Sequence, residues 1–424
     1  MGTGATSKAA VEERTRHWLE ANYLSALANL PDPSSGVFDR DGQLRCLTQY
    51  GFQEVQRKLK IFRWLDRFQF DSFIDVGSGF DYYPALVRER YGVETFFSDF
   101  AHSMNLPYGG GEFGKRDHSI TLNIARLPFA DDAFDVVLAS EVLEHLVRPL
   151  EALAELMRVA RKYVVITSLE ALSATRWQRL LSHLRVDPTQ PHVERNFFLL
   201  HELAAVFGPD WHHENLLHDP TLPASAFAPE SVREAAYRDL RTTEAFAAAL
   251  GGAVTVTDHR QGSMGILVAK PKAGAPVGAP RDDDHALARW LVERTGANQA
   301  TLYRLVEQIR AGTAPFAEPD RPIAAELLAR VRCPDCLGVL AAAGSGAHCA
   351  ACGTIFAGEY GVPILYPLRF PDPRPEAEWL ARLAQGDPHR RRIIRRAARR
   401  LRRNEPSPGP LRRLVQHLDR TFAS

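Results

Sequence analysis

A carboxylate and two glycines stand together at the end of an apolar run, in the sequence FIDVGSGFDYYP at residues 73–84. A glycine-rich turn after a strand lets the backbone approach a bound ligand, and the helix that follows offers free N–H groups. A dinucleotide-binding turn needs a third glycine three residues after the second, and Tyr82 holds that position. Asp75, which precedes Gly77 and Gly79, suits a hydroxyl or ammonium group and would repel a pyrophosphate. The turn therefore favours a ligand other than a dinucleotide.

A second carboxylate, Asp99, ends the run VETFFSD 24 residues after Asp75. A carboxylate at the end of the second strand can bind both hydroxyls of a ribose. The segment NIARLPFADDAFDVVLASEVLEHL follows at residues 123–146. With these features in this order, the chain resembles the class I S-adenosylmethionine-dependent methyltransferases, of the type 11 kind, over roughly residues 70–270.

The resemblance implies a set of cofactor-binding residues. Asp75, Gly77 and Gly79 would line the methionine and ribose part of S-adenosylmethionine, and Asp99 would hold the ribose hydroxyls. Asn123 would lie near the adenine amino group, Ile124 would pack on the ring, and Ser140 would complete the set. Relatives often carry an acidic residue in place of Asn123 and a glycine in place of Asp81, but an amide oxygen accepts the same hydrogen bond.

The acceptor end of the site is predicted at Glu141, Glu144 and His145, because open α/β sheets bind ligands at the carboxyl ends of their strands. The Asn/Asp-Pro-Pro-aromatic segment of amide- and base-nitrogen methyltransferases is absent here, which favours an oxygen acceptor. The ExxEH pattern also resembles the metal site of small-RNA terminal 2′-O-methyltransferases and ubiquinone-pathway O-methyltransferases. There a divalent ion such as magnesium (Mg2+), with His192 as a later ligand here, would lower the pKa of the acceptor hydroxyl. The alternative is that these side chains shape the acceptor pocket without a metal.

Two CxxC knuckles are separated by twelve residues, and their cysteines are Cys333, Cys336, Cys349 and Cys352. This spacing predicts a closed, tetrahedral and structural zinc (Zn2+) site, in preference to disulfides or a redox motif. With GTIFAGEYGVPILYP at 353–367, the segment resembles the zinc-ribbon proteins that activate several methyltransferases. That resemblance implies a ribbon that stabilises the methyltransferase or presents its substrate.

Alternating strands and helices indicate an α/β, Rossmann-like, mostly parallel sheet. We expect seven strands with an antiparallel edge formed by residues 253–259 and 263–270, together with a small C-terminal zinc ribbon. The domains expected are an N-terminal helical segment (1–69), the methyltransferase domain (70–270), a linker with helices (271–329), the zinc ribbon (330–368) and a basic helical or disordered tail (369–424).

Composition points to a globular chain with an uneven charge distribution. Apolar residues make up 45% of the 424 residues and charged residues 24%, and neither a signal peptide nor a membrane span is evident, which predicts a cytoplasmic protein. The net charge of +1 conceals a tail, residues 389–424, with twelve arginines and two acidic residues. This tail could bind RNA phosphates, lie on an anionic membrane or remain solvated.

These observations predict an S-adenosylmethionine-dependent methyltransferase that methylates an oxygen atom of an unidentified acceptor. An RNA-modifying enzyme that uses the ribbon and tail to bind substrate is one alternative, and a non-catalytic adaptor is another. The acceptor and the oligomeric state are left open by the sequence.

Overall fold

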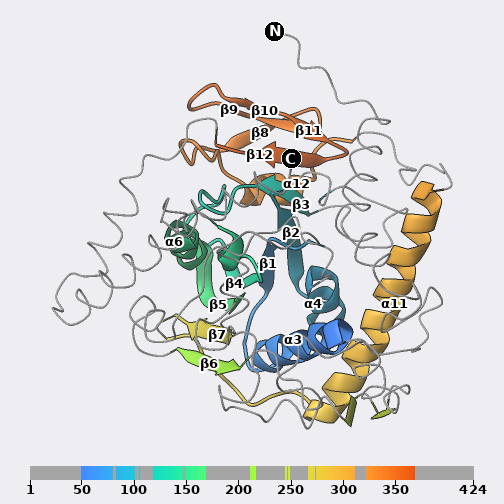
Figure 1. Cartoon of the computed structure of the whole chain (residues 1–424). Helices are drawn as coiled ribbons and strands as arrows, with labels where there is room; N and C mark the ends of the chain where they lie inside the picture. The colour runs from blue at the N-terminus through green and yellow to red at the C-terminus, as the bar shows by residue number, and fades with distance from the viewer. Residues whose placement is uncertain are drawn as a thin grey trace, which may run out of the picture.

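The computed structural model describes residues 49–79, 83–100, 105, 118–146, 149–168, 211–215, 244–245, 247–248, 266–272, 274–310 and 321–367. Its centre is a sheet of five parallel strands (Figure 1): β1 (Ser72–Val76), β2 (Glu94–Asp99), β3 (Ser119–Leu122), β4 (Phe134–Ser140) and β5 (Ala160–Ser168). The strand order reverses at β1, which pairs with β2 on one side and with β4 on the other. Loops that leave neighbouring strands in opposite directions open a crevice at this point, where open α/β sheets bind their ligands.

Two apolar cores lie on opposite faces of this sheet, because successive side chains of each strand point to opposite sides. Ile74 and Val76 of β1 face the core that contains α6 (Pro149–Val159). Phe73 of β1 faces the core that contains α3 (Gln49–Leu65), α4 (Tyr83–Tyr91) and α11 (Asp284–Arg310). Every residue of β1, β3 and β4 is buried, as the continuous apolar runs of a parallel sheet covered on both faces require.

The antiparallel edge is formed by β7 (Ile266–Pro271), which pairs with β5, and by β6 (His212–Asn215), which pairs with β7. The prediction of an antiparallel edge that includes residues 266–270 is confirmed. The second strand of this edge is β6, and the predicted strand at 253–259 lies outside the described residues. The short strand β3 was not predicted, since four residues between loops give little periodicity.

The C-terminal module contains α12 (Ala325–Arg330) and a three-stranded antiparallel sheet of β8 (Leu340–Ala343), β9 (Gly346–Cys349) and β10 (Ile355–Phe356). A hairpin of β11 (Gly358–Glu359) and β12 (Val362–Leu365) follows. β12 runs parallel to β3, with Ile364 opposite Thr121 and Leu365 opposite Leu122. Of the orange strands in Figure 1, β12 and its hairpin partner β11 therefore continue the central sheet, whereas β8, β9 and β10 form the separate sheet.

The predicted seven-stranded sheet is thus extended to nine strands, in the order β11-β12-β3-β2-β1-β4-β5-β7-β6. The C-terminal module, the predicted ribbon, also shares a core with this sheet, because Cys333, Cys349 and Phe356 belong to the same apolar cluster as α6. The cysteine spacing predicted a small module at residues 330–368, and the structure joins this segment to the sheet through backbone pairing and side-chain packing.

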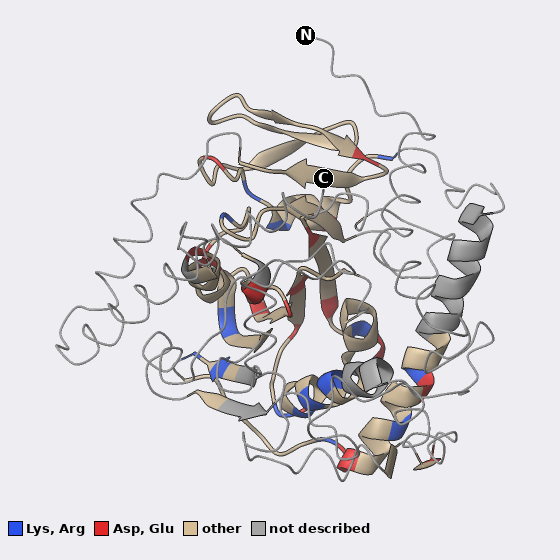
Figure 2. Ribbon diagram, in the orientation of Figure 1, with Lys and Arg blue, Asp and Glu red and all other residues tan. Residues whose placement is uncertain are grey.

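Charged side chains are distributed unevenly over these elements (Figure 2). Acidic residues stand on the central strands and the loops at their ends, and α3 carries a row of basic residues. The basic tail, the N-terminal segment and the loop after β5 lie outside the described residues. Among the helices that are described, none has the length and apolar character needed to cross a membrane.

Candidate cofactor and acceptor site

The glycine turn after β1 is held against the end of β2. Gly77 and Gly79 have φ angles of +87° and +46°, in the left-handed region that favours glycine. The N–H groups of Gly77 and Ser78 both donate to the carbonyl oxygen of Ser98, at 2.8 Å each. A Cβ atom on Gly77 would lie 2.5 Å from Cγ2 of Val142, in the segment after β4. The turn therefore needs glycine both for its backbone angle and for its contact with that segment.

The two predicted cofactor carboxylates lie at the ends of adjacent strands. Asp75 is 1% exposed, and its carbonyl oxygen accepts hydrogen bonds from the hydroxyls of Ser78 (3.0 Å) and Ser98 (2.8 Å). Oδ2 of Asp99 accepts the N–H of Gly79 at 3.1 Å. The structure thus brings the glycine turn and Asp99 into direct contact, and Asp99 Oδ2 already faces a backbone donor of the turn.

The segment after β3 begins with a turn that Asn123 closes. Oδ1 of Asn123 accepts the N–H of Ala125 at 3.0 Å, and the carbonyl oxygen of Asn123 accepts the N–H of Arg126 at 3.0 Å. Asparagine favours such turns because its side chain can hydrogen-bond to the backbone two residues ahead. Ile124 is buried in the core on the α6 side, which fixes the next position of the loop.

Asn105 joins the strands on either side of this region. Its Nδ2 donates to the carbonyl oxygen of Asp99 (3.0 Å) and to Oγ1 of Thr121 (3.1 Å). The bridge from the end of β2 to β3 was missed in the sequence, where a single asparagine in a loop carries no recognisable signal.

The segment after β4 presents its two glutamates in different states. Glu141 has a φ angle of +55°, and its N–H donates to the Thr167 carbonyl and hydroxyl oxygens at 3.1 Å. Its buried Oε1 has no hydrogen-bond partner among the residues that the structure describes. Glu144, in the short helix η3 (Leu143–His145), is 2% exposed, and its Oε2 accepts the hydroxyl of Ser168 at 3.0 Å. Glu144 is held by β5, whereas Glu141 sits in a strained conformation with a carboxylate oxygen available for a ligand.

Of the other predicted site residues, Ser140 is described in full, His145 by its backbone alone and His192 not at all. The hydroxyls of Ser140 and Thr167 lie 2.9 Å apart, so the Ser140 side chain joins β4 to β5. His145 ends η3, but its side chain, like all of His192, lies outside the described residues.

Two aromatic residues that were not predicted stand beside Asp99. Phe100 is 65% exposed, and its ring lies 5.1 Å from that of Tyr366, which follows β12. The hydroxyl of Tyr366 donates to the carbonyl oxygen of Phe100. Burial, together with the negative charge of Asp99, raises the pKa of Tyr366 to about 12, so this hydroxyl is a neutral donor at physiological pH. The ribbon therefore reaches the end of β2.

Residues 74–166 match the family model described as a methyltransferase domain. This segment is therefore similar to a methyltransferase domain. It contains the glycine turn, Asp99, the Asn123 turn and both glutamates, which are the residues on which the sequence prediction depended. The predicted Rossmann-like, mostly parallel α/β fold is confirmed for this part of the chain.

A relative from Methanocaldococcus jannaschii, an uncharacterized protein, is 34% identical over 110 residues, which are 26% of this chain and 44% of the relative. The chain thus spans less than half the length of that relative. Similar solved structures include a SAM-dependent methyltransferase from Archaeoglobus fulgidus (18% identity, 53% of this chain and 95% of that chain, TM-score 0.34). A complex that contains the Haloferax volcanii Trm112 methyltransferase activator also matches (16% identity, 55% of this chain and 96% of that chain, TM-score 0.32).

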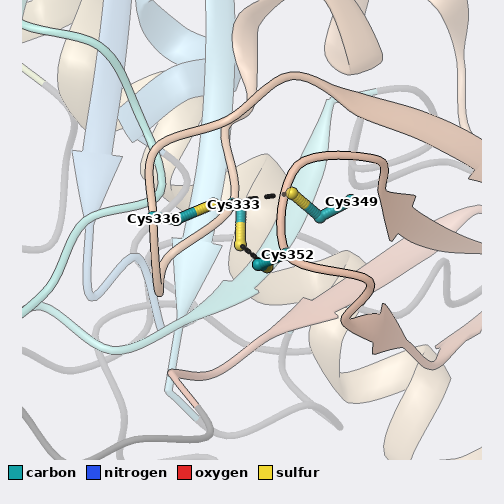
Figure 3. Close-up of side chains that lie close together, drawn as sticks. All are labelled: Cys333, Cys336, Cys349 and Cys352. Atoms are coloured by element: carbon teal, nitrogen blue, oxygen red, sulfur yellow. Dashed lines mark hydrogen bonds between the residues drawn. The ribbon is translucent and has the colours of Figure 1, made fainter.

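The four cysteines beside the methyltransferase domain converge on one point (Figure 3). Their sulfur atoms all lie within 4.8 Å of one another, and the pairs Cys333–Cys352 and Cys336–Cys349 are each 3.6 Å apart. Tetrahedral zinc with Zn–S bonds of about 2.3 Å places its sulfurs about 3.8 Å apart, so this donor set fits zinc. All four are free thiols in the structure.

Burial raises the pKa of the Cys333 thiol to about 12, whereas hydrogen bonds from the side chain and backbone of Thr354 lower the pKa of Cys352 to about 6. Thiolates are the zinc ligands, so binding of a metal must displace protons from the buried thiols. Among the described residues, the cysteines form the one group of three or more candidate metal ligands. Neither Glu141 nor Glu144 belongs to such a group.

Proposed function

We propose that this chain is an S-adenosylmethionine-dependent methyltransferase that transfers the methyl group to an oxygen atom of its acceptor. The observation that carries the proposal is the contact between the glycine turn and Asp99 at the point where the strand order reverses. The methyltransferase domain surrounds this point, and a carboxylate with a free acceptor oxygen, Glu141, follows the adjacent strand β4.

The cofactor would be held by residues at the ends of β1, β2 and β3. Asp99 would accept the ribose hydroxyls, and Gly77 and Gly79 would allow close approach of the ligand to the backbone, with Asp75 beneath them. Asn123 would accept from the adenine amino group with the second lone pair of Oδ1, while Ile124 would support the ring. The bound cofactor supplies a methyl group already activated by a sulfonium.

Because the methyl group is already activated, the residues of this chain must align the acceptor and take up its proton. Glu141 suits both tasks, since its carboxylate oxygen is buried, has no internal partner and is held by a strained backbone. Glu144, fixed by Ser168, would position η3 and with it His145, which would line the acceptor pocket. Ser140 would hold the carboxyl ends of β4 and β5 together through its hydrogen bond with Thr167.

A divalent ion such as Mg2+ at Glu141, Glu144, His145 and His192 is the alternative means of activating the acceptor oxygen. Enzyme dialysed against Mg2+-free buffer, which removes weakly held Mg2+ and leaves zinc on four cysteines in place, is then assayed with and without added Mg2+ to separate the two. Activity that survives treatment supports proton removal by Glu141, whereas activity restored only by Mg2+ supports the metal.

Zinc at the four cysteines would be structural, because four thiolates fill a tetrahedral site and leave no position for a substrate. We propose that it stabilises a module that joins the central sheet through β12. The close approach of the four sulfur atoms supports this role.

The test begins with binding of S-adenosylhomocysteine by isothermal titration calorimetry. Wild type should bind, and Asp99→Asn should bind at least about tenfold more weakly, since a charged hydrogen bond to the ribose is lost. Asp131→Asn is the matched control, because the exposed Asp131 pairs with Arg158 and precedes β4, at the end of the parallel strands opposite to Asp99. Failure of wild type to bind would leave a non-catalytic scaffold and reject the proposal.

The acceptor is then sought with cofactor carrying a labelled methyl group and fractionated cell extract of RNA, protein, lipid and small molecules. The labelled product is analysed for its methylated atom. Methyl transfer to oxygen that is lost in Glu141→Gln, with unchanged S-adenosylhomocysteine affinity, is the expected result. Transfer to nitrogen or carbon would overturn the choice of an oxygen acceptor.

A further inference from the structure

The zinc ribbon contacts two loops of the methyltransferase domain that would hold adenosine. The first contact is at the end of β2. Pairing of β12 with β3 places Tyr366 next to Phe100, where its hydroxyl donates to the Phe100 carbonyl oxygen and its ring lies 5.1 Å from the Phe100 ring. Phe100 directly follows Asp99, so Tyr366 fixes the backbone beside the predicted ribose ligand.

The second contact is between the loop after β3 and the first cysteine knuckle. Nε of Arg126 donates to the carbonyl oxygen of Pro334 at 2.9 Å, and Pro334 lies between Cys333 and Cys336. The N–H of the same Arg126 closes the turn begun by Asn123. Two residues further on, the Pro128 carbonyl oxygen accepts the N–H of Arg332 at 2.7 Å. The knuckle thus supports the turn that would face adenine.

These contacts depend on the conformation that four cysteines impose. Cys333 and Cys349 are fully buried in the core shared with the methyltransferase domain, and the N–H of Cys333 donates to the Gly338 carbonyl oxygen at 2.9 Å. A metal that fixes the knuckle would therefore also fix the Pro334 carbonyl oxygen. Loss of the metal would free the knuckle that holds Pro334, the partner of Arg126. It would also weaken the contact between ribbon and sheet that places Tyr366 beside Phe100.

We infer that Tyr366 and Arg126 are positioning residues that couple metal binding in the ribbon to cofactor binding in the methyltransferase domain. The inference rests on the proposed function and adds to it a link between two sites. Coupling between sites is reciprocal, so zinc should strengthen cofactor binding and the cofactor should slow the loss of zinc. Neither residue needs to touch the reacting atoms.

The first experiment measures the affinity of full-length, zinc-loaded protein for S-adenosylhomocysteine. Tyr366→Phe and Arg126→Gln should each weaken binding about threefold to tenfold, the usual worth of one hydrogen bond. Arg126→Lys, which keeps one donor, should restore part of the affinity.

Two variants serve as matched controls. Tyr163→Phe removes a hydroxyl that donates to the Pro276 carbonyl oxygen near the start of β5. Arg330→Gln removes a contact between the ribbon and the amino ends of the strands, to the Ala133 carbonyl oxygen and to Glu94. Both should bind S-adenosylhomocysteine within about twofold of wild type, although they lose comparable hydrogen bonds. Equal losses in test and control variants would show general destabilisation and overturn the inference.

The second experiment follows zinc transfer to a coloured chelator. Saturating S-adenosylhomocysteine should slow the transfer from wild type several-fold and should have little effect on the Tyr366→Phe, Arg126→Gln double variant. Transfer that is unaffected by the ligand in wild type would reject the coupling while leaving the proposed function intact. Absence of S-adenosylhomocysteine binding by wild type would reject both.

Discussion

Gly77 is the position at which the cofactor turn meets the acceptor segment, and its replacement by alanine tests that contact. The φ angle of +87° would cost an alanine about 1–2 kcal/mol, because L-residues rarely adopt left-handed backbone. The added Cβ would lie 2.5 Å from Val142 Cγ2, against 3.4–4 Å for ordinary contact. Relief needs a shift of about 1 Å in a packed region, which costs about 1–3 kcal/mol more. Gly77→Ala should therefore lower the free energy of unfolding by about 2–5 kcal/mol.

The steric part of this loss is separated by a double-mutant cycle with Val142→Ala. Val142 is half-buried, so its truncation alone should cost about 1 kcal/mol. In the double variant the clash is gone, and only the backbone strain and the lost methyl groups remain, about 2–3 kcal/mol in total. The double variant should therefore be more stable than the sum of the single losses allows, by about 1–3 kcal/mol.

The assay is denaturant unfolding with S-adenosylhomocysteine titration on the same samples. Gly79→Ala is the control for strain alone, because a Cβ there would meet no atom of the described residues within 4 Å and its φ angle is +46°. It should cost about 1 kcal/mol, with no recovery in combination with Val142→Ala. Strict additivity of Gly77→Ala and Val142→Ala would refute the contact between the two segments.

Three further variants test other parts of the structure. Burial raises the pKa of Asp135, but hydrogen bonds from the Arg161 side chain and from a backbone N–H outweigh burial and lower this pKa overall. The ionised Asp135 carboxylate therefore stabilises the fold above about pH 4, and this stabilisation is lost as pH falls through the lowered pKa. Asp135→Asn should therefore cost about 1–3 kcal/mol at pH 7 and less at pH 3 by urea unfolding, and an equal cost at both values would contradict this. Cys349→Ser, or removal of zinc, should lower the melting temperature of the ribbon and of the sheet together in calorimetry, because ribbon and sheet share one apolar core. Two separate unfolding transitions would argue against that shared core. Ser168→Ala removes the hydroxyl that donates to Glu144, so methyl transfer should slow while the affinity for S-adenosylhomocysteine stays unchanged. Weaker binding of S-adenosylhomocysteine would disprove a role of Ser168 and Glu144 confined to the acceptor.

Much of the methyltransferase domain could be predicted because its signals are local. The apolar runs of β1, β2, β4 and β5 and the glycine turn depend on residues adjacent in the chain, and the structure confirms them. Asp99 was found because its position at a strand end is fixed once the strand is recognised. β3 escaped prediction, and so did Asn105, because a short strand and a single bridging amide are defined only by the elements they contact.

The two glutamates show the same division at the scale of single side chains. The sequence placed Glu141 and Glu144 together at the end of β4 and treated them alike. The structure gives Glu144 a hydroxyl partner from β5 and leaves an oxygen of Glu141 without one. Which partner each side chain meets depends on a strand that follows more than fifteen residues later, so no local pattern distinguishes them.

The sequence alone determined the strands β1, β2, β4 and β5 with the helices between them, the glycine turn and the two cysteine pairs, because each depends on spacing along the chain. Only the tertiary structure decided that the ribbon's last strand continues the methyltransferase sheet and that Tyr366 reaches Phe100. The physical reason is that the pairing of Ile364 with Thr121, 243 residues apart, is selected by the backbone edge of β3 and by the apolar core that the two parts share. Neither of these exists until both parts have folded.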